Sequence, residues 1–479
     1  MKQLLFAFML TLIPAGKPLG TITAAEPAGQ AALHGGQVVL HAGQAALHGG
    51  QVGLHGVQAA LHVGQIARGG SLSAREEIAA NPWLAGSNYL DYDRQLPDFA
   101  YTRAPKGYVP FYLSHYGRHG SRWLIGEDDY ERVLRPLRKA RRDGKLTREG
   151  QETLRLLEIF NKTTYKRLGD LTTVGERQHH GIGRRLAEHF PEIFLSKGVP
   201  IDARSTTVNR CILSMVAECE ELMAANPTAR IHNDVSEALQ YYLNQPREGR
   251  VREARRKGRS ELEAFSSAHT HPDRLVSVLF SDRQWAADSV DTGRLMRHLF
   301  EVAINMQSHD DAPDLIHLFT TDEIYDLWRI QNVGWYLNYG PSPLTDSIMP
   351  FSQQNLLHNI IATADTCVAL GKPQATLRFG HEVCVLPLAC LMELDSCGVV
   401  VERFDDLDKV WRNYRIFPMA CNIQLIFYRP KKGEGDILVK ALLNEREAAL
   451  PVSTTQYPYY RWVDVRAYWD QKLREFEGK

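Results

Sequence analysis

Hydrophobic positions from residue 73 onward fall into two alternating kinds of segment. Short runs rich in β-branched and aromatic residues predict strands over residues 108–114, 201–203, 375–379, 421–428 and 437–443. Helical signals fill most of the remaining chain, and they predict helices over residues 74–80, 131–142, 206–225, 250–265, 292–305, 321–339, 353–369, 387–394 and 462–476. Strands that lie before, between and after helices predict an α/β fold.

The spacing of these segments suggests how the chain is organised. We expect a central mixed, mostly parallel sheet flanked by helices, with an inserted domain that is mainly α-helical. Residues 73–130 and 371–479 are predicted to form the two parts of the α/β core. Residues 131–370 are predicted to form the insertion, with a core strand and helix near 199–225. A capping box from Thr173 to Glu176 predicts the start of a helix that runs to about residue 190.

The first 72 residues follow a different pattern. A short basic start and an apolar run over residues 4–14 predict a signal peptide over residues 1–25. The alternative is an apolar but disordered terminus. Within residues 26–72, a Gly- and His-containing heptad recurs with few charges, which predicts a low-complexity, disordered linker. Five His residues of the repeat would share one helical face, so a metal-binding tract is the alternative.

Composition and charge exclude several functional classes. The 479 residues carry 56 basic and 56 acidic side chains, and 44% are hydrophobic. This balance argues against a nucleic-acid binder held by bulk positive charge and against a wholly disordered chain. The apolar run near the start is too short to span a bilayer, and no later stretch reaches eighteen uncharged apolar residues. Residues 1–72 hold three basic residues and one acidic residue, so the remainder has a net charge of −2.

Seven cysteines occur, all between residues 211 and 421. If the chain is exported, at most three disulfides can form and one thiol is left over. Their spacing does not fix which residues pair. The absence of a Cys-x-x-Cys sequence gives no support to a zinc ribbon or a thioredoxin motif.

The segment Arg118-His119-Gly120-Ser121-Arg122 directly follows a predicted strand. Arginine is the planar, permanently charged fork suited to phosphate oxygens, and a neutral histidine can attack phosphorus. Two nearby guanidinium groups should lower the pKa of His119 and keep it deprotonated in acid. The alternative without a catalytic role is a surface turn with a hydrogen-bonded histidine.

Two further strand ends carry the same chemistry. Arg204 lies where a short strand meets a helix, so an anion there would meet a guanidinium and helix N-terminal amides. His381 and Glu382 follow the strand at 375–379 and offer an imidazole beside a carboxyl group. Ligands of open α/β sheets collect beyond the carboxyl ends of strands, so these residues are expected to share one crevice with His119. No Asp-rich metal motif accompanies them, and we expect neither a metal nor a cofactor.

At these residues the chain resembles the histidine phosphatase superfamily, most closely the acid-phosphatase branch with phytases and multiple inositol polyphosphate phosphatases. The resemblance covers about residues 74–479, including the segments at 115–122, 171–175, 203–206 and 377–382. It implies that His119 becomes a phosphohistidine. It also implies that Arg118, Arg122, Arg204 and His381 bind the phosphoryl oxygens, and that Glu382 protonates the leaving oxygen.

The acid position departs from the family pattern. The branch usually shows His-Asp, or His-Ala-Glu in the inositol polyphosphate enzymes, whereas Glu382 follows His381 immediately and Val383 cannot transfer a proton. Glu382 is therefore the expected acid, and a role limited to orienting water or the backbone is the alternative. Basic runs at 132–142 and 247–259 could bind further phosphates, although such runs are more often solvated helix faces.

These observations predict an exported, periplasmic or secreted phosphomonoesterase that acts on phytate or other inositol phosphates through a phosphohistidine. A general acid phosphatase for sugar phosphates, a phosphomutase and a catalytically weak phosphate-binding protein are the alternatives. We expect a small-molecule phosphomonoester as substrate, with no nucleic-acid partner and no membrane span. The oligomeric state and the preferred ester are left open.

Overall fold

A computed structural model describes residues 72–96, 100–246 and 249–478. The predicted signal peptide and the heptad-repeat linker lie outside these residues. No helix in the described ranges combines the length and the hydrophobicity that a membrane span needs.

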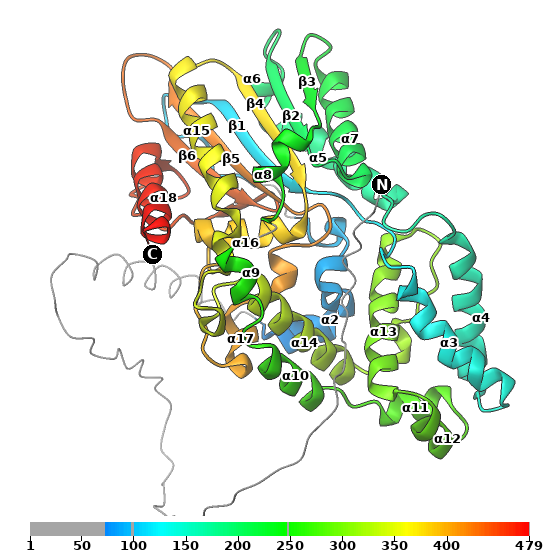
Figure 1. Cartoon of the computed structure of the whole chain (residues 1–479). Helices are drawn as coiled ribbons and strands as arrows, with labels where there is room; N and C mark the ends of the chain where they lie inside the picture. The colour runs from blue at the N-terminus through cyan, green and yellow to red at the C-terminus, as the bar shows by residue number, and fades with distance from the viewer. Residues whose placement is uncertain (1–71, 97–99, 247–248, 479) are drawn as a thin grey trace, which may run out of the picture. The chain divides into compact units, whose positions relative to one another are not determined.

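The described chain is built around one eight-stranded mixed sheet (Figure 1). Its strands are β1 (Tyr108–Arg118), β2 (Pro200–Ser205), β3 (Arg230–Asp234), β4 (Gln374–Gly380), β5 (Asn422–Pro430), β6 (Leu438–Leu443), β7 (Arg446–Ala448) and β8 (Tyr460–Arg461). They follow the order β3-β2-β4-β1-β5-β6-β7, and β8 pairs with β6. The pairings from β3 to β1 are parallel, and those from β1 onward are antiparallel.

The α/β fold with a mixed sheet and flanking helices is confirmed, but "mostly parallel" describes only one half of the sheet. The late strands β5 and β6 are joined by a short connection and pair as an antiparallel hairpin. Strand β5 then lies against β1 in the antiparallel direction. A parallel partner needs a long crossover connection, and the segments that join β5 to β6 and β6 to β7 are too short to supply one.

Alternate residues of the strands pack against helices on opposite faces of the sheet, as the twofold repeat of a strand requires. Leu113 of β1 and Leu377 of β4 lie in a cluster with apolar residues of two helices, α5 (Thr173–His189) and α7 (Asn209–Ala225). Tyr112 of β1 faces the other way, into a cluster that includes α15 (Gln354–Leu370), α16 (Glu382–Met392) and α18 (Trp462–Glu477). Figure 1 shows α5 and α7 on one side of the strands and α15 on the other.

A third hydrophobic cluster consists almost entirely of helices, and Figure 1 shows it away from the strands. Its members include residues of α3 (Asp128–Arg142), α4 (Arg148–Thr163), α11 (Asp273–Leu279), α13 (Thr292–Asn305) and α14 (Thr321–Tyr339). The remaining α-helices are α2 (Ala74–Ala80), α6 (Pro191–Phe194), α8 (Gln240–Leu243), α9 (Arg250–Ala254), α10 (Arg259–Ala268), α12 (Arg283–Ser289) and α17 (Phe404–Val410). The boundaries predicted for the inserted domain stay a prediction.

Two local predictions were wrong in detail. Thr173 and Glu176 do not form the expected capping box, because the N-cap of α5 is Thr172, whose hydroxyl accepts a hydrogen bond from the N–H of Gly175 at 3.2 Å. The helix expected over 250–265 is broken into α9 and α10. Gly258 between them has a φ of +71°, in the left-handed region where a helix cannot continue.

Candidate active site

Three parallel strands bring their carboxyl ends to one edge of the sheet. In the register of β1 and β4, Arg118 lies opposite Gly380, and in that of β2 and β4, Ser205 lies opposite Phe379. The residues that follow β1 and β4 therefore lie side by side. This is the edge at which open α/β sheets bind their ligands.

His119 is held in one orientation by its own loop. Its backbone N–H donates to the carbonyl of Gly380 at 3.0 Å, and its carbonyl accepts from the N–H of Ala420 at 3.1 Å. The ring Nδ1 lies 2.8 Å from the carbonyl oxygen of Gly120, so Nδ1 carries the hydrogen and donates it. Nε2 is buried and makes no hydrogen bond to any described residue. The lone pair of Nε2 is thus the group that the loop presents for chemistry.

The surroundings of His119 favour its neutral form. Burial lowers its pKa well below the usual value, and the positive charges of Arg210, Arg118 and Arg122 lower it further. A buried imidazole among guanidinium groups gains a proton only at a large electrostatic cost. The expectation from sequence that neighbouring arginines depress this pKa agrees with the structure, although Arg210 was not among the residues expected to do so.

Arg118 is a fully buried arginine with fixed partners. Its Nη1 donates to the backbone carbonyls of Asn88 at 2.6 Å and Pro418 at 3.1 Å. Its Nε lies 3.0 Å from Oε2 of Glu382. Burial lowers the pKa of Arg118, and the charge of Glu382 opposes that effect. The guanidinium group is therefore locked between the backbone and the carboxylate of Glu382.

His381 and Glu382 start helix α16 beside this loop. His381 is the N-cap residue, and its ring lies edge-on to that of His119 with 5.6 Å between centroids. Oε2 of Glu382 lies 3.7 Å from Nε2 of His119. Burial raises the pKa of Glu382, but the charges of Arg118 and Arg122 outweigh burial and bring that pKa to about 2. Burial and the charge of Arg210 lower the pKa of His381 to about 3.

Arg122, at the far end of the loop, is also buried. Its guanidinium carbon lies 5.4 Å from the ring centroid of Tyr89, and its Nη1 donates to the carbonyl of Trp123 at 2.9 Å. The charge of Arg122 lowers the pKa values of both His119 and Glu382. Five of the six residues predicted from sequence, namely His119, Arg118, Arg122, His381 and Glu382, are thus brought together.

Arg204, the sixth predicted residue, has other partners. It pairs with Asp202 at 2.5 Å, and its Nη1 donates to the hydroxyl of Tyr242 at 3.0 Å. These partners raise the pKa of Arg204 against the effect of burial. No contact between Arg204 and His119 occurs among the described residues, whereas neighbouring strand residues Ala203 and Ser205 are fully buried. The alternation of β2 therefore places Arg204 among Asp202 and Tyr242.

Arg210 is the residue that the sequence argument missed. It lies in the first turn of α7, and its Nη1 donates to the carbonyl of Gly169 at 3.2 Å. Burial and the charge of Arg122 lower the pKa of Arg210 to about 10, which shows how crowded the positive charge is. The available signal was the position of Arg210 at the start of a helix that directly follows a core strand, where helix dipole and guanidinium act together.

His119, His381 and Glu382 place three candidate ligand atoms within 4.8 Å of one another, close enough to hold a metal ion. The three neighbouring guanidinium groups make the same position unfavourable for a dication, since like charges repel strongly where water is excluded. The donor set suits an anion better than a metal. A tetrahedral oxyanion would meet the guanidinium groups, and its central atom would face Nε2 of His119.

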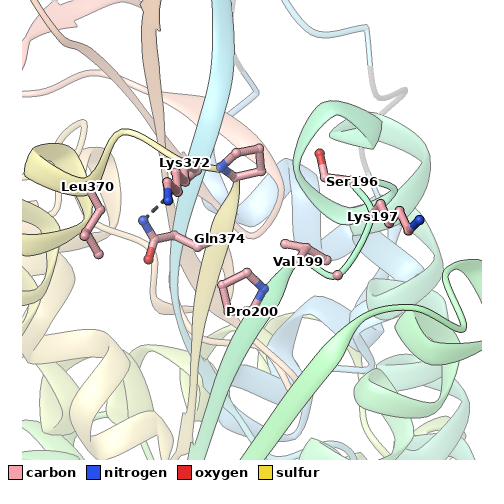
Figure 2. Close-up of a pocket in the computed structure, with 9 residues that line it drawn as sticks. Ser196, Lys197, Val199, Pro200, Leu370, Lys372 and Gln374 are labelled. Atoms are coloured by element: carbon pink, nitrogen blue, oxygen red, sulfur yellow. Dashed lines mark hydrogen bonds between the residues drawn. The ribbon is translucent and has the colours of Figure 1, made fainter.

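A separate shallow hollow of about 280 Å³ lies at the opposite edge of the sheet (Figure 2). It is formed by the segments that lead into β2 and β4, including Val199, Lys372 and Gln374. The Nε2 of Gln374 donates to the carbonyl of Lys372 at 3.3 Å. Because this hollow adjoins the amino ends of the strands, it is distinct from the candidate active site.

The fold is shared with solved phosphatase structures. The multiple inositol polyphosphate phosphatase of Bifidobacterium longum without ligand matches with a TM-score of 0.63 and 18% identity, over 80% of this chain and 97% of that chain. The same enzyme in complex with inositol hexasulfate has a TM-score of 0.62. The phytase from D. castellii matches with a TM-score of 0.59 and 12% identity, over 82% of this chain and 85% of that chain.

Comparisons with models of protein families and with curated protein sequences give no match. The resemblance to the acid-phosphatase branch with phytases and inositol polyphosphate phosphatases is confirmed at the level of the fold. At 12–18% identity, the likeness speaks for the architecture. The chemistry must be argued from the residues themselves.

Proposed function

We propose that this chain is a phosphomonoesterase that transfers a phosphoryl group to His119 and then to water, with inositol phosphates as substrates. The observation that carries the proposal is the unpaired Nε2 of a neutral, buried His119 within the field of Arg118, Arg122 and Arg210. Such an arrangement would hold a nucleophile beside the charges that stabilise the phosphoryl oxygens before substrate binds. The named inositol phosphatase and phytases with this fold support the choice of substrate.

In the first step, Nε2 of His119 attacks phosphorus while the bond to the ester oxygen breaks. His381 and the three arginines would bind the equatorial oxygens, and Glu382 would deliver a proton to the leaving alkoxide. In the second step, water attacks the phosphohistidine, Glu382 accepts the proton, and inorganic phosphate and His119 are released. Oε2 of Glu382 lies 3.7 Å from Nε2, which brings a carboxyl group beside the position that the phosphoryl group would occupy.

A carboxyl group with a pKa of about 2 is ionised in acid and needs a source for the proton that it donates. A phosphate monoester supplies one, because it carries a proton below its second pKa of about 6. Its negative charge also offsets the guanidinium charges that hold the pKa of Glu382 down. We infer that substrate binding loads Glu382 with the proton that the leaving group takes.

His119→Ala tests the nucleophile. We expect turnover of p-nitrophenyl phosphate and inositol hexakisphosphate to fall below detection, and wild-type protein quenched in alkali, where a phosphohistidine is stable, to carry phosphate on His119. His180→Ala, on the outer side of α5, serves as the matched control and should keep wild-type rates. Undiminished turnover by His119→Ala would exclude the mechanism.

Glu382→Gln tests the proton donor. We expect a much larger loss of kcat with an alkyl phosphate such as an inositol phosphate than with p-nitrophenyl phosphate, whose leaving group needs no proton. Equal losses on the two esters would remove Glu382 from the acid role. The low pKa of Glu382 is also the observation that favours a catalytically weak phosphate-binding protein. Tight phosphate binding by wild-type protein without hydrolysis of either ester would establish that alternative.

The finer parts of the assignment need their own measurements. Export to the periplasm or the medium is proposed from the first 25 residues, and N-terminal sequencing of the mature protein tests it. The preference among esters is tested by product analysis with inositol hexakisphosphate beside a simple sugar phosphate. Faster hydrolysis of the sugar phosphate would favour a general acid phosphatase, and isomerised product without free phosphate would favour a mutase.

A further inference from the structure

A buried histidine–glutamate pair joins α5 and α7, the two helices that contact the loop after His119 (residues 119–122). Nδ1 of His179 on α5 lies 2.7 Å from Oε1 of Glu218 on α7, and both side chains are fully buried. Burying an ionisable pair costs free energy that its mutual attraction repays only when the geometry is good. None of the proposed chemical steps uses either residue, so another role has to account for the pair.

Each of these helices holds one residue of the loop that follows His119. On α5, Oε1 of Gln178 accepts from the N–H of Ser121 at 2.9 Å, and Nε2 of Gln178 donates to the hydroxyl of Ser121 at 3.0 Å. On α7, the hydroxyl of Ser214 accepts from the N–H of Gly120 at 3.1 Å. Two successive peptide groups of the loop, His119–Gly120 and Gly120–Ser121, are therefore each held by one helix.

The same face of α7 also carries Arg210, the charged residue with the largest effect on the pKa of His119. Arg210, Ser214 and Glu218 are spaced by four residues, which places them above one another on the helix. Among the charged neighbours of His119, Arg210 has the largest effect on its pKa. A shift of α7 along or away from α5 would move Arg210 and the partner of Gly120 together.

The backbones of α5 and α7 approach each other closely at Gly183, which has no side chain to separate them. A Cβ on Gly183 of α5 would lie 2.7 Å from the carbonyl oxygen of Glu218. Beneath them lies His115 on β1, whose ring fills the space beside Gly117 and whose pKa burial lowers to about 4. The hydrogen bond between His179 and Glu218 is thus made between two helix backbones that lie close together.

We propose that His179 and Glu218 are positioning residues, which set the register of α5 against α7 and thereby place the His119 loop and Arg210. The inference rests on the proposed phosphatase activity. The pair does not touch substrate, and its effect on turnover passes through Gln178, Ser214 and Arg210. A displacement of reacting groups by about 1 Å can lower a rate by about a hundredfold.

The chain offers a matched control for this pair. His180 and Glu221 join the same two helices through a contact of 3.0 Å, but their side chains are 27% and 23% exposed. His180 follows His179 directly, and Glu221 lies three residues after Glu218. We call His179 and Glu218 the inner pair, and His180 and Glu221 the outer pair. A general effect of cross-linking α5 and α7 would depend on both pairs, whereas positioning of the loop depends only on the inner one.

The test compares Glu218→Gln and His179→Gln with His180→Ala and Glu221→Ala in the full chain, with p-nitrophenyl phosphate as the probe. We expect the inner variants to lose at least tenfold in kcat, with a smaller change in KM. We also expect the acid limb of their kcat/KM profile to move to higher pH, because a displaced Arg210 no longer lowers the pKa of His119. The outer variants should match wild type in both respects.

Several outcomes would overturn the proposal. Inner variants that unfold at lower temperature but keep the wild-type kcat and pH profile would show a structural role only. If the single variants fail to fold, the double variant His179→Leu/Glu218→Leu replaces the pair by apolar groups of suitable size. Wild-type kinetics in that folded variant would exclude positioning. Failure of the phosphatase assignment itself is distinguishable, because wild-type protein would then form no phosphohistidine.

Discussion

The chemistry of the site depends on which nitrogen of His119 is free. The carbonyl of Gly120 holds the hydrogen on Nδ1, so Nε2 keeps its lone pair and faces Glu382. In the proposed reaction, positive charge from three arginines around Nε2 would stabilise the phosphoryl oxygens, as a metal ion does in metal-dependent phosphatases. The overall balance of 56 basic and 56 acidic residues gives no hint of this concentration of charge.

Variants of Arg210 and Arg204 test which of the two arginines acts on His119. Arg210→Ala should lower kcat/KM for p-nitrophenyl phosphate by at least tenfold, because it removes the largest charge effect on His119. The pKa of His119 is depressed in the folded protein, so loss of a cation raises it. The acid limb of kcat/KM should therefore move to higher pH. Arg204→Ala, whose partners are Asp202 and Tyr242, should change neither quantity substantially.

At the scale of elements, the loop after His119 packs directly against the start of α5. The two backbones are in close contact, since a Cβ on Gly120 would lie 2.3 Å from the carbonyl oxygen of Gly175. The N–H of Thr172 donates to the carbonyl of Ser121 at 2.9 Å, which joins the N-cap of α5 to the loop. The glycine of the His119 segment is therefore needed for contact with protein backbone.

Gly175→Ala tests this contact. The new Cβ would lie 2.3 Å from the carbonyl oxygen of Ser121, so the loop or the helix must move. We expect a loss of about 1–3 kcal/mol in the free energy of unfolding and a lower kcat. Gly181→Ala on the same helix meets only the end of the Arg185 side chain and should gain about 0.5–1 kcal/mol. Chemical denaturation of both variants measures the difference, and equal effects would contradict the close contact.

At the scale of the whole molecule, the candidate active site lies where the sheet meets the mainly helical cluster. The carbonyl of Asn88 binds Arg118, and Nδ2 of Asn305 on α13 donates to the carbonyl of Arg122 at 3.2 Å. The loop after His119 thus extends from the sheet edge to residues of the helical cluster. This arrangement needs no covalent cross-links, because all seven cysteines are buried and unpaired in the structure.

The structure predicts that all seven cysteines are free thiols. In protein denatured without reductant, we expect thiol titration to find seven reactive groups, and a reducing agent should leave the Tm unchanged. Burial raises the pKa of thiols such as Cys211 to about 11, so the native protein should react slowly with thiol reagents. Fewer than seven thiols in protein purified from an oxidising compartment would show that disulfides form and would contradict the free-thiol structure.

The sequence by itself determined the α/β class, the strands β1, β2, β4, β5 and β6, and five residues that the structure brings together. Residues 375–379 alternate between apolar and polar side chains, as a strand does, and the Arg-His-Gly-Ser-Arg segment holds its candidate nucleophile and cations in adjacent positions. The three-dimensional structure decided what depends on distant residues. The choice of Arg210 over Arg204 depends on which way a strand and the following helix point their side chains. The antiparallel half of the sheet depends on pairing between strands, and pairing energy is not encoded in either strand alone.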